Sequence, residues 1–99
     1  MIYQNQTAAR LILQTDVNFN TDVVSSRLIK YRKPSGTTGS WTAATLTGSE
    51  TTGKIYIDFS ASNKFDEAGS WTLWAYLTFS DGRFANGAAA TYQVPTEGA

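Results

Sequence analysis

Residues 71–79 carry the pattern that most constrains the fold of this chain. Apolar side chains occupy every second position, and the positions between them hold Thr72, Trp74, Tyr76 and Thr78. A period of two residues predicts a β-strand. The Ser80-Asp81-Gly82-Arg83 sequence that follows predicts a type I′ turn, because Asp-Gly tolerates positive φ at both central positions. We therefore expect a hairpin whose second strand runs from Arg83 through Val94, with Asn86-Gly87 as a bulge or bend.

The same two-residue period recurs in other segments that lie between turn-forming residues. It predicts strands at residues 27–33, 40–46 and 54–59, and it predicts a second hairpin turn at residues 34–39. Residues 10–15 are expected to form a further strand, and residues 1–4 a short edge strand. Residues 60–67 are interpreted either as irregular chain or as a single helical turn, capped by Ser62 or Asn63, with Phe65 plugging the core.

About seven short strands without a helical stripe predict an all-β chain. We expect a single immunoglobulin-like antiparallel β-sandwich. Its 99 residues predict one domain over residues 1–99, with an ordered core from about residue 8 to residue 95. The side chains expected to meet between the two sheets are Tyr31, Ile55, Ile57, Trp71, Leu73 and Leu77.

Charge and composition argue against several classes of partner. Eight Lys and Arg balance eight Asp and Glu, so no net field draws the chain to nucleic acid or to an anionic membrane. No apolar stretch approaches the roughly 20 residues of a membrane span, and residues 1–10 lack the apolar core of a signal peptide. We expect cytoplasmic synthesis, no nucleic-acid partner and no membrane partner.

Few side chains are candidates for chemistry, since Cys and His are both absent. The acids weighed as a general acid and base are Asp58, Asp66, Glu67 and Asp81. Asp81 is better explained by its turn, and Asp66 by the corner before the long strand. No calcium loop, serine-lysine motif or phosphate loop before a helix is visible. We expect no enzymatic activity, no catalytic residue, no metal and no cofactor.

Arg27, Lys30, Arg32 and Lys33 form the densest charge cluster of the sequence. Such a cluster neutralises phosphates when it lies beside exposed aromatic rings. The alternative is a solvated strand edge that blocks unwanted pairing. The zero net charge favours the second interpretation.

Aromatic residues provide the candidate interaction surface. If Trp71 and Leu73 face the core, Trp74 and Tyr76 point out of the sheet, next to Lys30 and Arg32 of a neighbouring strand. The predicted surface comprises Lys30, Arg32, Trp41, Trp74 and Tyr76, with either orientation open for Trp41. The alternative is that the rings are covered within the chain, by a loop or by the stems of Lys30 and Arg32.

Two segments carry a resemblance to a known family. Residues 29–43 (IKYRKPSGTTGSWTA) and 68–83 (AGSWTLWAYLTFSDGR) resemble the small immunoglobulin-like proteins found among tail and virion structural proteins of tailed bacteriophages. The resemblance covers most of residues 8–94. Its motifs, YRKP-turn-W and AGxWxxWAxxxFxDG, are folding motifs that carry no catalytic residue.

The resemblance implies a non-enzymatic virion structural protein and does not fix which part of the virion. We expect a tail or baseplate component that binds other phage structural proteins in a symmetric assembly through sheet faces and loops. A head decoration or neck protein is the alternative within that class. A carbohydrate-binding module for host adhesion, in which Trp41, Trp74 and Tyr76 stack on a glycan, is the alternative of another class. The implied location is the virion, after synthesis in the bacterial cytoplasm.

Overall fold

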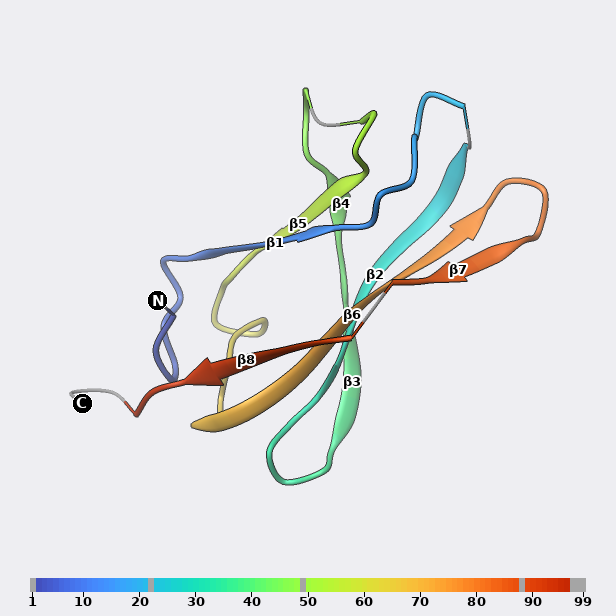
Figure 1. Ribbon diagram of the computed structural model, residues 1–99. Helices are drawn as coiled ribbons and strands as arrows, with labels where there is room; N and C mark the ends of the chain where they lie inside the picture. Colours follow the sequence, from blue (N-terminus) through green and yellow to red (C-terminus); the bar gives the residue numbers. More distant parts are fainter. Residues whose placement is uncertain (1, 22, 49, 88, 97–99) are drawn as a thin grey trace.

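The structure, a computed structural model, describes residues 2–21, 23–48, 50–87 and 89–96, and none of these residues is helical. Figure 1 shows two layers of strands. The strands are β1 (Arg10–Gln14), β2 (Val24–Arg32), β3 (Thr38–Thr42), β4 (Ala44–Thr45), β5 (Lys54–Asp58), β6 (Gly69–Phe79), β7 (Phe84–Asn86) and β8 (Ala90–Val94). The predicted immunoglobulin-like antiparallel β-sandwich is confirmed.

The strands form one three-stranded and one five-stranded antiparallel sheet. The first has the order β1-β5-β4, and the second has the order β3-β2-β6-β7, with β8 also paired to β6. β6 is the longest strand and pairs with β2, β7 and β8. This central position follows from its sequence, because both of its faces carry large side chains that need neighbours.

The chain changes sheets at Ala43, between β3 and β4. The Ala43 N–H still donates to the carbonyl of Arg27 in the five-stranded sheet, at 2.9 Å. One residue later, Ala44 pairs with Tyr56 of β5 in the other sheet. The predicted strand over residues 40–46 is therefore two strands, and the corner between them joins the two sheets at one side of the sandwich.

Both hairpins of the five-stranded sheet close with three-residue loops. In the β6–β7 loop, the Phe79 N–H donates to the Arg83 carbonyl and the Gly82 N–H donates to the Phe79 carbonyl. Gly82 has a φ of +90°, whereas Asp81 is not among the non-glycine residues with positive φ. The prediction of a type I′ turn is wrong: this is a type I turn followed by one left-handed glycine. The Asp81 carboxylate favours it by accepting from the Arg83 N–H at 3.1 Å.

Aromatic rings fill the space between the sheets. Phe65 and Trp71 have no exposed surface, and their ring centroids lie 4.8 Å apart. Of the core residues predicted from the sequence, Ile55, Ile57, Trp71, Leu73 and Leu77 are buried and Tyr31 is half-buried. Residues 60–67 bring Phe65 into this core as irregular chain, without a helical turn.

Two further strand predictions need correction. Residues 2–4 are not a strand, although the Gln4 N–H donates to the Pro95 carbonyl. The predicted return strand over residues 83–94 is split into β7 and β8, and the Gly87 N–H between them donates to the Ala75 carbonyl. Met1 and Ala88, which these predictions included, lie outside the described residues.

Candidate functional site

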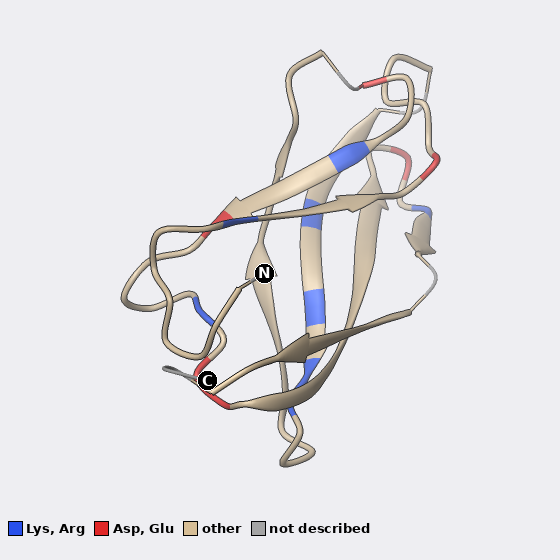
Figure 2. Ribbon diagram, turned by 60° about the vertical axis from the view of Figure 1, so that its left-hand side comes forward, with Lys and Arg blue, Asp and Glu red and all other residues tan. Residues whose placement is uncertain are grey.

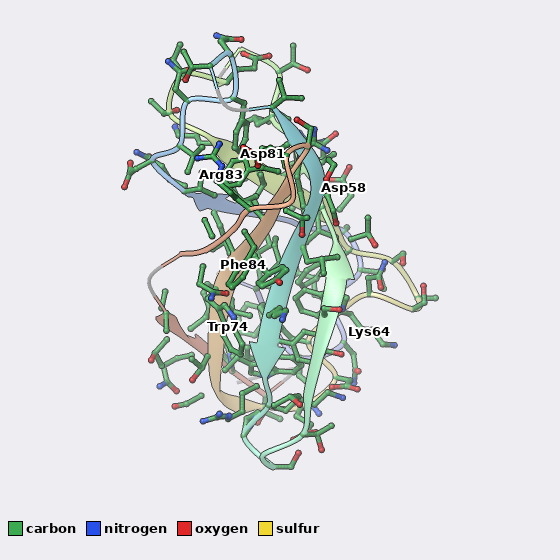
Figure 3. The ribbon with its side chains drawn as sticks, turned by 90° about the vertical axis from the view of Figure 1, so that its right-hand side faces the viewer. Asp58, Lys64, Trp74, Asp81, Arg83 and Phe84 are labelled. Carbon is green, nitrogen blue, oxygen red and sulfur yellow. The ribbon has the colours of Figure 1, made fainter. Side chains whose placement is uncertain are left out.

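The outward positions of β2, β6 and β7 place aromatic and cationic side chains on one side of the five-stranded sheet. Lys30 pairs with Trp74 across β2 and β6, and Leu28 pairs with Tyr76. Thr78 pairs with Phe84 of β7. Because facing residues of paired strands share a face, these side chains lie together. We call Lys30, Arg32, Trp74, Tyr76 and Phe84 the aromatic-cationic face; Figure 3 shows Trp74 and Phe84 on the same side of the sheet.

Three of these side chains form a continuous stack. The Lys30 ammonium lies 3.9 Å from the centroid of the Tyr76 ring, within the range of a cation-π contact. The Tyr76 and Phe84 rings are stacked, with centroids 5.9 Å apart and an interplanar angle of 19°. Phe84, the outer member, is 64% exposed. Lys30 thus covers part of Tyr76, as one of the two interpretations predicted, while Phe84 stays largely exposed.

An open depression lies beside this stack and crosses three strands. Its lining residues are Lys30, Arg32, Thr38, Gly39, Ser40 and Trp74. Arg32 is exposed, and its guanidinium has no ion-pair or hydrogen-bond partner among the described residues. Figure 2 shows basic residues recurring along β2, whereas the acidic residues lie in loops and at strand ends. The depression is therefore a cationic site with an aromatic wall.

Trp41 does not belong to this face. It is 5% exposed, and its ring packs in the core against Tyr31, Phe59, Phe65 and Trp71. The reason is the alternation of β3, in which Thr38, Ser40 and Thr42 take the outward positions and leave Trp41 the inward one. Of the five residues predicted for the surface, the structure brings together Lys30, Arg32, Trp74 and Tyr76.

The same alternation divides the predicted basic cluster between the two sides of the sheet. Lys30 and Arg32 point outward, whereas the Lys33 ammonium lies 2.8 Å from an Asp66 carboxylate oxygen. Arg27 pairs with the inward-facing Leu77, and the buried Arg27 Nε has no hydrogen-bond partner among the described groups. These four cations therefore do not form one patch.

The four acids weighed for catalysis lie at separate places. The Arg10 guanidinium binds Asp58 through Nε at 2.6 Å, and Arg83 Nε donates to Asp81 at the same distance. Asp66 binds Lys33, and its neighbour Glu67 accepts a hydrogen bond from the Ser35 hydroxyl at 3.0 Å. Within residues 2–21, 23–48, 50–87 and 89–96 there is no group of three or more acids that could hold a metal ion. The same residues contain no helix long and apolar enough to cross a membrane.

Hydrogen bonds from Arg10 hold the pKa of Asp58 below its ordinary value. Because the folded-state pKa is depressed, the ionised carboxylate stabilises the fold above the unfolded pKa, and this stabilisation is lost as the pH falls through the folded pKa. Both side chains are well exposed, so the effect on stability is small.

We expect the Arg10→Gln variant to return the pKa of Asp58 to its ordinary range, measured by carboxyl NMR during an acid titration. Asp81 is the internal control, since its lowered pKa comes from the backbone N–H and side chain of Arg83. If the depressed pKa of Asp58 persists in the Arg10 variant, the assigned cause is wrong.

Phe84 is the member of the face that the sequence prediction missed. A two-residue Asp81-Gly82 turn would have paired Phe84 with Phe79, whose side chain is buried. The three-residue loop instead pairs Phe79 with Arg83 and shifts Phe84 opposite the outward-facing Thr78. A shift of one residue exchanges the two faces of a strand. The turn type therefore decides that Phe84 is exposed.

Comparisons with known proteins support the fold. No protein-family model matches this chain, and no curated protein matches it. Among solved structures, the chain is similar to CopC from Methylosinus trichosporium OB3b, with a TM-score of 0.59 and 12% sequence identity. The match covers 99% of this chain and 87% of that chain. At this identity the similarity concerns the fold, and no activity is transferred from CopC.

The same comparison contradicts the function expected from the sequence resemblance. The matching structure is CopC and not a phage structural protein, and none of the comparisons provides evidence for a phage protein. The predicted role as a tail, baseplate, head or neck component of a virion is therefore set aside.

Proposed function

We propose that this chain is a non-enzymatic binding domain that contacts another protein through the aromatic-cationic face. The observation that supports this most directly is the Lys30-Tyr76-Phe84 stack, which ends in a ring that is 64% exposed. A sheet whose outer face meets only water places polar residues at these positions. The large rings on this face are better explained by a contact surface.

The residue types of the face suit a protein partner. Tyr, Trp and Arg are enriched at the centres of protein interfaces, where their large side chains become desolvated. Here Trp74 is half-buried beside the depression, and Arg32 at its rim has no partner within the described chain. Together the rings offer apolar area and the two cations offer charge, which favours a partner that carries carboxylates.

Site-directed photo-crosslinking in the cells that make this chain tests the proposal. A photoreactive residue at Asn86, exposed on β7 beside the face, should give a discrete adduct with one protein, identified by mass spectrometry. The same residue at Gln14, exposed on β1 of the other sheet, is the matched control and should give no such adduct.

The chemistry of the face is tested by removing its rings. The double change Trp74→Ser and Tyr76→Ser should abolish the Asn86 adduct while a thermal melt still shows cooperative unfolding, because neither ring belongs to the buried core. Equal adducts from Asn86 and Gln14, or an adduct that survives in the folded double variant, would contradict the proposal. Binding of the folded chain to an array of glycans, without a protein adduct, would do so as well.

A further inference from the structure

The outer edge of β3 carries backbone groups that pair with no strand in the described part of the chain. β3 is the first strand of its sheet and pairs with β2 on one side only. The Lys33 N–H donates to Thr37 and the Ala43 N–H donates to Arg27. Because bonded positions alternate along an antiparallel pair, residues 37, 39, 41 and 43 direct their backbone groups towards β2. The backbone groups of Thr38, Ser40 and Thr42 therefore point away from the sheet.

This edge lacks the usual protection against strand addition. Natural edges are blocked by prolines, bulges or charged side chains, above all lysine. β3 has the sequence TGSWT, with no charge, no proline and regular pairing along its whole length. Its outward side chains are small hydroxyl groups, and they leave space above the strand, where Thr38 and Ser40 line the depression.

The strand next to this edge, β2, carries the two cations of the outer face, Lys30 and Arg32. Arg32 pairs with Thr38, and Lys30 pairs with Ser40, so both cations follow β2 directly behind the free edge. A strand added to β3 would lie about 10 Å from β2, within the combined reach of a basic side chain and a glutamate. The other sheet offers a contrast: its edge strand β1 begins with Arg10, which is already bound to Asp58.

We propose that the partner presents an extended acidic segment, which pairs antiparallel with the free edge of β3 and places carboxylates beside Lys30 and Arg32. The inference rests on the proposed protein-binding function and names the chemistry of the partner. Residues of the added strand that lie opposite Thr38, Ser40 and Thr42 both hydrogen-bond to β3 and point their side chains over the outer face. Acidic residues are therefore required at alternate positions of the partner, the same positions whose N–H groups bond to β3.

A nine-residue peptide of alternating Thr and Glu serves as the probe for the intact chain. Its binding is followed by NMR, where the amide signals of Thr38, Ser40 and Thr42 should shift. N-methylation of the Glu residues removes the donors that face β3 and should weaken binding at least about tenfold. N-methylation of the Thr residues, which removes outward-facing donors only, is the matched control and should change affinity less than about threefold.

The charge requirement is tested on both molecules. Replacing Glu by Gln in the peptide, or Arg32→Glu in the chain, should weaken binding about tenfold, since each replaces an attraction between charges. Lys54→Glu is the control, because it changes the net charge equally from β5, a strand of the other sheet. Arg32 has no partner in the described chain, so its replacement should leave the melting temperature unchanged.

The outcomes separate this inference from the proposed function. If both N-methylated peptides bind equally, or if the Gln peptide binds as well as the Glu peptide, the inference that an acidic strand pairs with β3 is wrong. A partner crosslinked at Asn86 would still support the proposed binding face in that case. If the acidic peptide binds β3 as expected but Asn86 gives no protein adduct in cells, the edge accepts a strand and the proposed function fails. Absence of any peptide binding at millimolar concentration overturns the inference.

Discussion

Replacing Trp71 with alanine should lower the free energy of unfolding by about 3–5 kcal/mol, the usual cost of deleting a buried aromatic side chain. Trp71 has no exposed surface, and its ring lies 4.8–6.0 Å, between centroids, from those of Tyr31, Trp41 and Phe65. Its indole N–H also donates to the Glu67 carbonyl at 2.9 Å. The alanine variant therefore leaves a cavity and removes the hydrogen bond that ties residues 60–67 to the long strand.

This loss is a large fraction of the about 5–15 kcal/mol that stabilises an ordinary domain. Urea unfolding followed by fluorescence of the remaining tryptophans measures it. Trp74→Ala on the same strand is the matched control: it deletes the same atoms from a half-buried outward position and should cost clearly less. Equal losses for Trp71 and Trp74 would mean that the inward and outward faces of β6 do not differ in packing.

The faces of the long strands were predictable because alternation is a local property. In β6 the side chains at odd positions from 71 to 79 are all apolar and buried. The side chains at even positions from 70 to 78 are half-buried or exposed. Trp41 obeyed the same rule. Its polar neighbours Ser40 and Thr42 mark the outward face, so the inward orientation of Trp41 was available from the sequence.

The features that escaped prediction depend on contacts between distant residues. The corner at Ala43 exists because the chain leaves β2 and joins β5, and no local pattern distinguishes this from a continuous strand. The β6–β7 loop depends on whether Asp81 adopts positive φ or binds the Arg83 N–H instead. That choice pairs Phe84 with the outward-facing Thr78, leaves its ring exposed and so determines one end of the candidate site.

The function expected from the resemblance failed for a related reason. Tyr31, Trp41 and Trp71, which define the two motifs, are ring neighbours in the core. Gly82 is the left-handed residue of the turn. Such positions report how a sandwich folds and carry little information about what it binds, since binding residues are placed on a fold independently of its core. The residues that carry the present proposal lie on the outer face and at the free edge.

Replacing Gly53 with alanine is the second change for which we expect a large effect. Gly53 is buried and has a φ of +66°, a conformation that costs an L-residue about 1–2 kcal/mol. A Cβ at this position would also overlap the Thr15 hydroxyl and the Val17 backbone carbonyl. These groups have little room to move, because the Thr15 N–H and hydroxyl both donate to the Gly53 carbonyl, at 3.0 and 2.7 Å.

Gly82→Ala separates the two contributions. Gly82 also has positive φ, at +90°, but a Cβ there would meet nothing within 4 Å. We expect Gly82→Ala to cost about 1–2 kcal/mol from the backbone conformation alone, and Gly53→Ala to cost at least about 3 kcal/mol because the overlap adds to it. Chemical denaturation of both variants gives the comparison. Similar losses would show that residues 15–17, which follow β1, move to make room for the added methyl group. Tight packing of Gly53 against this segment would then not contribute to stability.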